Sequence, residues 1–223
     1  MVVFSVLKND LIHVGNDGTQ NGADGNGMAE RRLILASASP RREEMLRMLG
    51  LRFSILQGDV NEDPRAGEPP EDYALRLSEM KARAVAGMRT GHWVLGADTV
   101  VTIDGELMGK PRTIDEARGM IRKLSGREHT VITAFCLVNS EYPELVRRAV
   151  ASQVRFKDVP DDEMEWYVAT DEPYDKAGGY AVQGKASFLI SEIRGSYTNV
   201  VGLPLCEVVE ELKKLGLVNF EGD

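Results

Sequence analysis

The sequence predicts an α/β fold in which strands and helices alternate along the chain. Short apolar runs at residues 33–36, 93–97 and 130–138 are typical of buried strands, and capped amphipathic segments between them predict helices. The chain has 223 residues, of which 43% are hydrophobic. That is long enough to bury the core of one large domain or of two lobes.

Charge and cysteine content exclude several classes of protein. The net charge is −8, whereas proteins that bind duplex nucleic acid through its phosphates are usually basic, so we expect no nucleic-acid polymer as partner. Cys136 and Cys206 stand in apolar contexts typical of buried free thiols in a reducing compartment, which indicates a cytoplasmic protein. The three histidines are scattered and form no zinc pattern, so a bound metal would use oxygen ligands, as Mg2+ and Mn2+ do. We expect no membrane span, because no apolar run is long enough to cross a bilayer.

Residues 1–27 are predicted to be a disordered leader. Gly15 to Gly27 is mostly Gly, Asn and Asp, which cannot bury enough apolar surface to stay ordered. The apolar stretch before it is too short and interrupted for a signal-peptide core. We therefore expect the folded domain to begin at Met28 and to span residues 28–223.

The first strand leads directly into the start of a helix. After residues 33–36, Ser39 is a predicted N-cap, and Pro40 suits the first helical position because its missing N–H costs nothing there. Gly50 is the predicted end of this helix.

The first turn of this helix carries two arginines, although the helix dipole disfavours cations at that end. Arg41 and Arg42, together with free N–H groups and nearby serine hydroxyls, indicate a site for a phosphate or another anion. The alternative is an ordinary capped helix whose arginines pair with Glu43 or Glu44.

The next segments predict a strand at residues 53–57, an acidic loop that ends at Glu62 and Asp63, and a long helix over residues 71–88. Lys81 lies beside the apolar stripe of that helix. On its own, Lys81 is most simply a surface lysine whose stem covers apolar surface while its head stays in water.

Asp98 is a carboxylate inside an apolar, strand-rich stretch, where burial without a partner is costly. We expect it at the C-terminal end of strand 93–97, with residues 100–103 continuing beyond it. Because open α/β sheets bind ligands at the carboxyl ends of their strands, this position indicates a functional site. The alternative is a structural aspartate that caps a turn.

The remaining elements follow from turn and cap signals. They are a hairpin turn at Asp104-Gly105, a capping box at Thr113–Glu116 that opens a helix to Leu124, an antiparallel strand pair at 130–138 and 147–156, a helix at 161–169, a strand at 188–193, a loop at 195–204 and a helix at 205–215.

Two glycine-containing segments carry further candidate residues. Lys110 stands on a loop between Gly109 and Pro111. In residues 175–184, two adjacent glycines permit unusual backbone angles or close approach of a ligand, and the Gln183 amide can recognise a base edge. The alternative for this segment is a glycine-rich turn between elements.

Five motifs, in order, resemble those of the Maf family of nucleoside triphosphate pyrophosphatases. They are Ser37–Arg42, Gly96–Val101, Gly109–Pro111, Asp175–Gly184 and Gly195–Pro204, within a resemblance that covers residues 32–216. The resemblance implies an α/β fold with a mixed twisted sheet, flanking helices and two lobes around a deep cleft, as in Maf and ITPase-like proteins. It also implies hydrolysis of a nucleoside triphosphate to the monophosphate and diphosphate with a divalent cation, and it allows a homodimer.

The resemblance also assigns roles to residues. Asp98 matches the family's proposed catalytic base, although its carboxylate could instead orient the attacking water or hold the metal. Glu62 is the second carboxylate expected at the site, as a metal ligand or as the partner of Asp98. Positions expected to bind substrate or set specificity are Ser39, Arg41, Arg42, Lys81, Thr99, Lys110 and Gln183. Arg41, Thr99 and Gln183 match the branch that prefers dTTP and UTP. Gly179 departs from the family pattern, which usually has alanine there.

Two other functions stay open. A nucleotide-binding regulator of cell division or septum formation would bind nucleotide with little turnover, whereas a 7-methyl-GTP pyrophosphatase would differ in its preferred substrate. A Nudix hydrolase and a P-loop protein are disfavoured, because the sequence contains neither motif.

Overall fold

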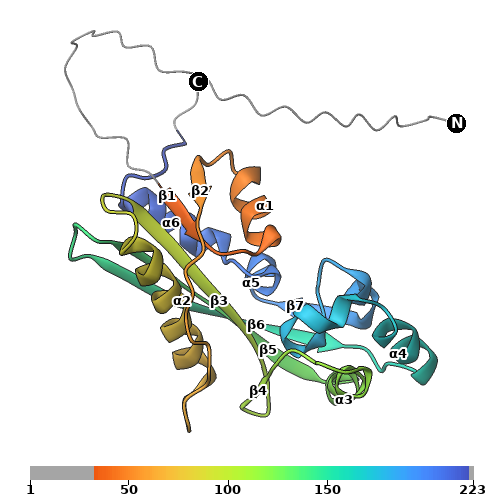
Figure 1. Cartoon of the computed structure of the whole chain (residues 1–223). Helices are drawn as coiled ribbons and strands as arrows, with labels where there is room; N and C mark the ends of the chain where they lie inside the picture. Colours follow the sequence, from red (N-terminus) through yellow and green to blue (C-terminus); the bar gives the residue numbers. More distant parts are fainter. Residues whose placement is uncertain (1–32, 221–223) are drawn as a thin grey trace, which may run out of the picture.

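The computed structural model describes residues 33–220, so the predicted leader and the expected start at Met28 lie outside the described residues. Within this range a mixed sheet of seven strands has the order β2-β1-β3-β5-β6-β7, with β4 paired to β3 (Figure 1). β1 is parallel to β2 and β3, and the other pairs are antiparallel. The strands are β1 (Leu33–Ala36), β2 (Phe53–Ile55), β3 (Trp93–Ile103), β4 (Glu106–Met108), β5 (Glu128–Asn139), β6 (Leu145–Phe156) and β7 (Ile190–Arg194).

Helices cover both faces of this sheet. Side chains alternate between the two faces along a strand, so Val94 of β3 packs toward one side with the long helix α2, while Trp93 and Leu95 pack toward the other with α1 and α6. The α-helices are α1 (Pro40–Met48), α2 (Pro70–Ala86), α3 (Ile114–Leu124), α4 (Asp161–Val168), α5 (Tyr197–Val201) and α6 (Leu205–Lys214). Three 3-10 helices are η1 (Glu172–Asp175), η2 (Ala177–Gly179) and η3 (Lys185–Leu189). None of the helices in the described range is long and apolar enough to cross a bilayer.

The molecule has two lobes, each with its own large hydrophobic core. One core joins β1, α1 and α6 to the first half of β3, through residues such as Leu46 and Leu95. The other joins α3, α4 and η3 to the second half of β3, through residues such as Ile121 and Leu189. The long strands β3 and β5 run through both lobes (Figure 1). The predicted fold, a mixed sheet with flanking helices and two lobes, is therefore confirmed.

Most predicted elements are present, and several predictions are wrong in detail. The strand predicted at 53–57 ends at Ile55. The stretch 195–204 is not wholly a loop, because Ser196 caps a short helix, α5, by accepting a hydrogen bond from Asn199 N at 3.2 Å. The last strand begins at Ile190 rather than at 188, because η3 occupies the preceding residues.

The position of Asp98 also needs correction. Asp98 is not at the end of a strand, because β3 continues to Ile103 and Asp98 pairs with Ala134 of β5. The neighbouring strand β1, however, ends at Ala36, opposite Gly96. Asp98 therefore lies just past the carboxyl end of β1, beside the loop that leads into α1.

Candidate active site

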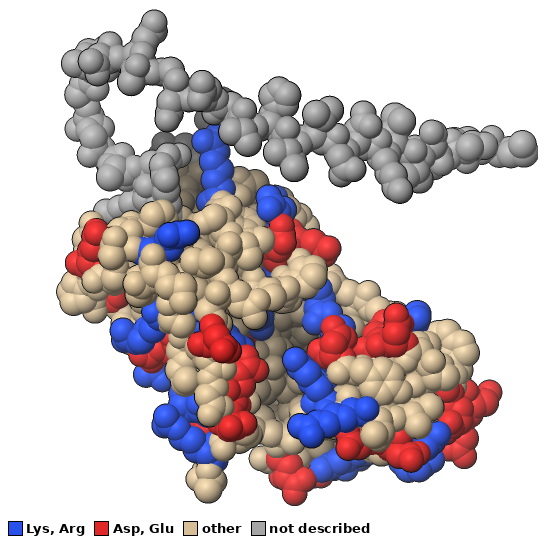
Figure 2. Space-filling view, in the orientation of Figure 1, with Lys and Arg blue, Asp and Glu red and all other residues tan. Residues whose placement is uncertain are grey.

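A cleft of about 1100 Å³ is lined by residues of both lobes, and all nine predicted site residues are among them. They are Ser39, Arg41, Arg42, Glu62, Lys81, Asp98, Thr99, Lys110 and Gln183. Figure 2 shows a face that is hollowed between the two lobes, with Lys and Arg side chains around the hollow and Asp and Glu side chains beside them. Residues from six separated segments of the chain thus meet in one place.

The start of α1 forms one end of the cleft. Ser39 occupies the N-cap position as predicted, but its side chain accepts no hydrogen bond from the described helix, so the predicted side-chain cap is wrong. Its backbone N–H instead donates to Ser37 Oγ at 3.2 Å. The Ser39 hydroxyl and the first-turn N–H groups therefore stay available to an anion.

Arg42 is partly buried and held by neutral acceptors. Its Nε donates to Gly202 O at 2.7 Å, and Nη1 donates to Ser37 Oγ at 3.1 Å and to Ala97 O at 3.0 Å. Nη2 donates to Thr99 Oγ1 at 2.9 Å. Burial lowers the pKa of Arg42, partly offset by the negative charge of Asp98. This places a fixed positive charge in the wall of the cleft.

The predicted alternative, in which the helix-start arginines pair with Glu43 or Glu44, is not found. Glu43 pairs with Arg47, one turn further along α1. Arg41 makes no hydrogen bond or ion pair with any other residue of the range 33–220, although it lines the cleft. Its guanidinium is therefore free to bind an anionic ligand.

Lys81 joins the two predicted carboxylates. Its Nζ lies 2.6 Å from Asp98 Oδ1 and 2.7 Å from Glu62 Oε1. Lys81 is therefore not a solvated surface lysine, since only 18% of its side chain is exposed. Lys81 and Asp98 come from α2 and β3, which approach closely at Gly96.

Gly96 explains the close contact between α2 and β3. A Cβ atom at this position would lie 2.3 Å from Ser78 O and 2.7 Å from Ala82 N, both on the backbone of α2. Only glycine leaves room for that approach, which brings Lys81 within reach of Asp98.

The two carboxylates on Lys81 differ in proton affinity. Burial raises the pKa of Asp98 above its ordinary value, although the positive charges of Lys81 and Arg42 oppose the shift. Burial also acts to raise the pKa of Glu62, but the hydrogen bond and charge of Lys81 outweigh it, so the net pKa is lowered. Two carboxylates with pKa values pushed apart are suited to different roles.

The opposite wall of the cleft comes from the second lobe. Lys110 and Gln183 are both exposed there, and neither side chain bonds to another described residue. Gly178 N donates to Gly109 O at 2.9 Å, so the two loops that carry these residues are tied together. The positive φ of 73° at Gly178 favours glycine at this junction.

Two further cationic residues, which were not among the predicted site residues, line this wall. Lys176 lines the cleft with only 13% of its side chain exposed and pairs with Asp175. Its place beside the two glycines was the available signal. Arg112 also lines the cleft, and no sequence pattern distinguished it from a surface arginine.

A divalent cation fits the carboxylates only if the nucleotide supplies the remaining ligands. Residues 33–220 contain no group of three or more His, Cys, Asp or Glu side chains that could hold a metal alone. Asp98 Oδ2 makes no hydrogen bond to the described chain and is not sealed from solvent, and the side chain of Glu62 is 54% exposed. Mg2+ is commonly bound by one or two carboxylates together with substrate phosphates and water, so this donor set suits it.

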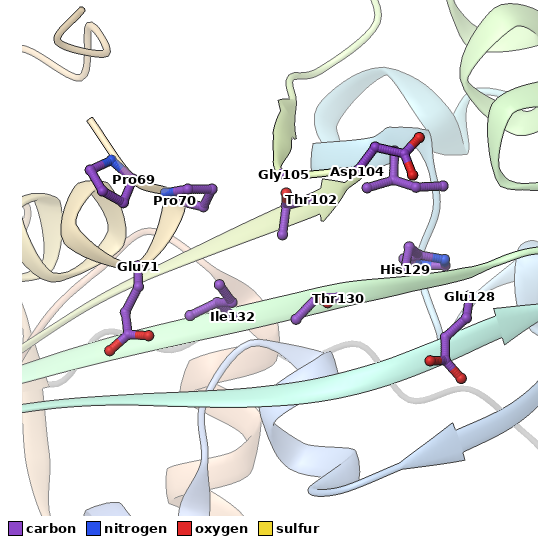
Figure 3. A pocket seen from close by; sticks show the side chains of 11 residues that line it. Pro69, Pro70, Glu71, Thr102, Asp104, Gly105, Glu128, His129, Thr130 and Ile132 are labelled. Carbon is purple, nitrogen blue, oxygen red and sulfur yellow. The ribbon is translucent and has the colours of Figure 1, made fainter. Parts of the chain in front are cut away.

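A second, smaller hollow of about 310 Å³ does not suit a triphosphate. It lies between the start of α2, at Pro69 and Pro70, and two strand ends, the C-terminal end of β3 and the N-terminal end of β5 (Figure 3). The charged side chains that line it are Glu71, Asp104 and Glu128, and its described lining includes no Lys or Arg. Negative charge there would repel phosphate groups, so the larger cleft is the candidate site.

Comparisons with known proteins identify relatives of the chain. A family model described as "Maf-like protein" matches residues 32–215. The dTTP/UTP pyrophosphatase of Syntrophus aciditrophicus (strain SB) is 52% identical over 196 residues, which are 88% of this chain and 96% of that protein. The dTTP/UTP pyrophosphatase of Geobacter sp. (strain M21) is 50% identical over 189 residues, 85% of this chain and 98% of that protein.

A third relative, of slightly lower identity, has the same name. The dTTP/UTP pyrophosphatase of Myxococcus xanthus (strain DK1622) is 48% identical over 185 residues, 83% of this chain and 93% of that protein. The solved structure of the Staphylococcus aureus Ham1 protein aligns with 57% of this chain and with 73% of its own chain, at 15% identity and a TM-score of 0.40.

Proposed function

Because the chain belongs to the Maf family, we propose that it is a nucleoside triphosphate pyrophosphatase that hydrolyses dTTP and UTP to the monophosphate and diphosphate. One observation carries the proposal: a cleft between the lobes combines several cationic side chains with a buried carboxylate, Asp98. The likeness to dTTP/UTP pyrophosphatases over most of the chain supports the choice of substrate.

Binding of the triphosphate rests on cations from both lobes. Arg41, Arg42 and the first turn of α1 provide donors at one end of the cleft, and Lys110 and Lys176 provide positive charge at the other. A triphosphate carries several negative charges, so several cations are needed to bind it when it moves from water into the cleft. Positive charge held in place before the reaction also stabilises charge that develops on the phosphate oxygens.

Asp98 is the proposed general base. A water oxygen attacks the α-phosphorus while the bond from that phosphorus to the bridging oxygen of the diphosphate breaks, and the water proton passes to Asp98. The raised pKa of Asp98 strengthens it as a proton acceptor. Lys81, 2.6 Å from Asp98 Oδ1, fixes the carboxylate and leaves its second oxygen to face the cleft.

Glu62 and Asp98 would together hold a divalent cation, Mg2+ or Mn2+, with the nucleotide phosphates completing its ligands. When bound, such a cation neutralises phosphate charge and stabilises the leaving diphosphate. Glu62 suits this role because the lowered pKa keeps its carboxylate ionised.

Gln183 is the proposed reader of the pyrimidine. Its amide is exposed in the cleft and makes no hydrogen bond within the described chain, so both its donor and its acceptor are available to a base edge. The side chains of Arg41 and Ser39 also make no hydrogen bond within residues 33–220, and we propose that they contact the phosphates.

We further propose a cytoplasmic location and a homodimer. Nucleoside triphosphates are substrates of the cell interior. Cys136 is buried as predicted, whereas Cys206 is exposed, so that part of the prediction is wrong; an exposed free thiol fits a reducing compartment. The homodimer rests on the family resemblance alone, and light scattering of the purified chain tests it.

The test of function is release of diphosphate from a panel of nucleoside triphosphates, with Mg2+, with Mn2+ and with a chelator. We expect metal-dependent release from dTTP and UTP well above that from GTP and 7-methyl-GTP. Preference for 7-methyl-GTP would place the chain in the other substrate branch, and binding without release would favour the regulator of cell division. Glu62→Gln should raise the Mg2+ concentration that gives half-maximal activity.

A further inference from the structure

The side chain of Arg42 begins a series of hydrogen bonds that leads away from the cleft and becomes buried at Thr133 and Asn199. Arg42 Nη2 donates to Thr99 Oγ1 at 2.9 Å, and Thr99 Oγ1 lies 2.9 Å from Thr133 Oγ1. Thr133 Oγ1 in turn donates to Asn199 O at 2.9 Å. These contacts connect α1, β3, β5 and α5. Neither Thr133 nor Asn199 lines the cleft.

Which group donates in each of these hydrogen bonds follows from counting the hydroxyl protons. Each threonine hydroxyl has one proton to donate, and that of Thr133 is used on Asn199 O. The Thr99 hydroxyl must therefore donate to Thr133 and accept from Arg42. The alternative acceptor for Thr99, Gly202 O, is 3.5 Å away, at the limit of a hydrogen bond. All donors then point one way, an arrangement in which neighbouring hydrogen bonds strengthen one another.

Asn199 is the rigid end of this series of hydrogen bonds. Its side chain is fully buried, with Oδ1 accepting from Thr133 N at 3.0 Å and Nδ2 donating to Val131 O at 3.1 Å and Ser152 Oγ at 2.9 Å. Ser152 also holds the start of α5, because its Oγ accepts from Ser196 N at 3.0 Å. Every donor and acceptor of the Asn199 amide is used, so the backbone carbonyl that receives the chain cannot shift freely.

We propose that Thr133 and Asn199 are positioning residues, which hold the Arg42 guanidinium in its phosphate-binding orientation through Thr99. The proposal rests on the proposed function, since it assigns Arg42 to the triphosphate. It gives Thr99 a role in phosphate binding rather than in contact with the base: its one proton is directed into the protein, away from the ligand.

The experiment replaces the Thr133 hydroxyl without changing side-chain size. Thr133→Val should raise KM about tenfold for dTTP, UTP and GTP alike, which is the loss of about one hydrogen bond to a charged group. Thr133→Ser retains the hydroxyl and should restore KM. Thr130→Val is the matched control. Thr130 lies on the same strand, but its hydroxyl donates to Gln153 Oε1 at 3.0 Å and takes no part in the hydrogen-bond relay from Arg42 through Thr99 and Thr133 to Asn199. This variant should leave KM unchanged.

A double-mutant cycle separates positioning from a general effect on folding. Thr99→Val and Thr133→Val interrupt the same relay, so the double variant should lose little more than either single variant. Additive losses, an unchanged KM in Thr133→Val, or an equal loss in Thr130→Val would each overturn the proposal.

Inorganic tripolyphosphate provides a probe that does not depend on turnover. By calorimetry, Thr133→Val should weaken its binding about tenfold and Thr133→Ser should not. If the wild-type chain releases no diphosphate from any nucleotide, the proposed function fails, but a loss of tripolyphosphate affinity confined to Thr133→Val still supports the relay. Unchanged affinity overturns the relay whatever the activity.

Discussion

Lys81 Nζ lies 2.6 Å from Asp98 Oδ1, and yet the pKa of Asp98 is raised. An ion pair normally lowers the pKa of a carboxyl, so burial of Asp98 outweighs its pairing with Lys81. The folded protein therefore holds a carboxylate at a cost in stability. Such a cost is typical of a site kept for function.

The Asp98→Asn variant should lose at least about 100-fold in kcat, the low end of the effect of a general base. It should remain folded, because the amide removes the charge whose burial is unfavourable and keeps the shape of the side chain. Steady-state hydrolysis of dTTP and thermal unfolding measure the two effects. Near-wild-type turnover would contradict the assignment of Asp98 as base.

The raised pKa of Asp98 also predicts how activity depends on pH. The base must be ionised to accept a proton, so kcat/KM should fall on the acid side at a pH above the ordinary aspartate value of 3.8. Because the charge of Lys81 opposes the upward shift, Lys81→Gln should move this acid limb to still higher pH. The pH–rate profiles of both proteins test this, and coincident acid limbs would count against the coupling.

Arg41 and Arg42 should behave differently although they are adjacent. Arg41→Ala should weaken nucleotide binding and change the free energy of unfolding by less than about 0.5 kcal/mol, because Arg41 makes no hydrogen bond or ion pair with another residue of the range 33–220. Arg42→Ala should weaken binding and also destabilise the protein by about 1–3 kcal/mol, because it leaves Gly202 O and Ala97 O without their donor. Urea unfolding and KM give the two quantities, and equal stability losses would contradict the distinction.

The parts of the fold that could be predicted from sequence depend on local signals. The first helix starts at Pro40, as its fixed φ suggests, and Gly50 beyond its end has a positive φ of 70°. The turn at Asp104-Gly105 has positive φ at both residues, as a two-residue hairpin requires. These helix ends and turns are determined by residues within a few positions of them, so they could be predicted from the local sequence.

The parts that could not be predicted depend on partners far away in the chain. β3 continues past Asp98 because β5 pairs with it to Thr102, and no local pattern shows where a neighbouring strand ends. The hydrogen bonds between Thr133 and Asn199 join residues 66 positions apart. The nine candidate site residues converge in one cleft, and the resemblance to a known family, rather than hydrophobic periodicity, singled them out.

Gly96→Ala should impair both folding and catalysis. The added methyl would meet the backbone of α2 at Ser78 O and Ala82 N, which cannot move as a side-chain tip could. Forced overpacking costs about 1–3 kcal/mol, and displacement of α2 would lengthen the contact between Lys81 and Asp98. Unfolding and kcat measure these effects.

The control for this variant is Gly119→Ala. Gly119 lies in α3, where a Cβ atom would meet nothing within 4 Å. Alanine is a better helix former than glycine, so Gly119→Ala should be neutral or stabilising by up to about 1 kcal/mol. Gly96→Ala with wild-type activity would show that α2 does not need this close approach.

His129 predicts an acid-sensitive core in the second lobe. It is 2% exposed, with Nε2 2.6 Å from Tyr180 Oη and ring contacts to Phe156, and burial lowers its pKa to about 4. Between that value and the ordinary 6.5 the unfolded chain binds a proton that the folded chain does not, so stability should fall as pH falls through this window. From pH 6.5 to pH 5 the loss should be about 1.6 kcal/mol, somewhat less than the full 1.36 kcal/mol per pH unit because the unfolded histidine is already half protonated at pH 6.5. Urea unfolding at both pH values tests this in the wild type and in His129→Gln, which cannot take up the proton. The variant should lose less stability over the interval, and equal losses in the two proteins would show that His129 does not cause the acid sensitivity.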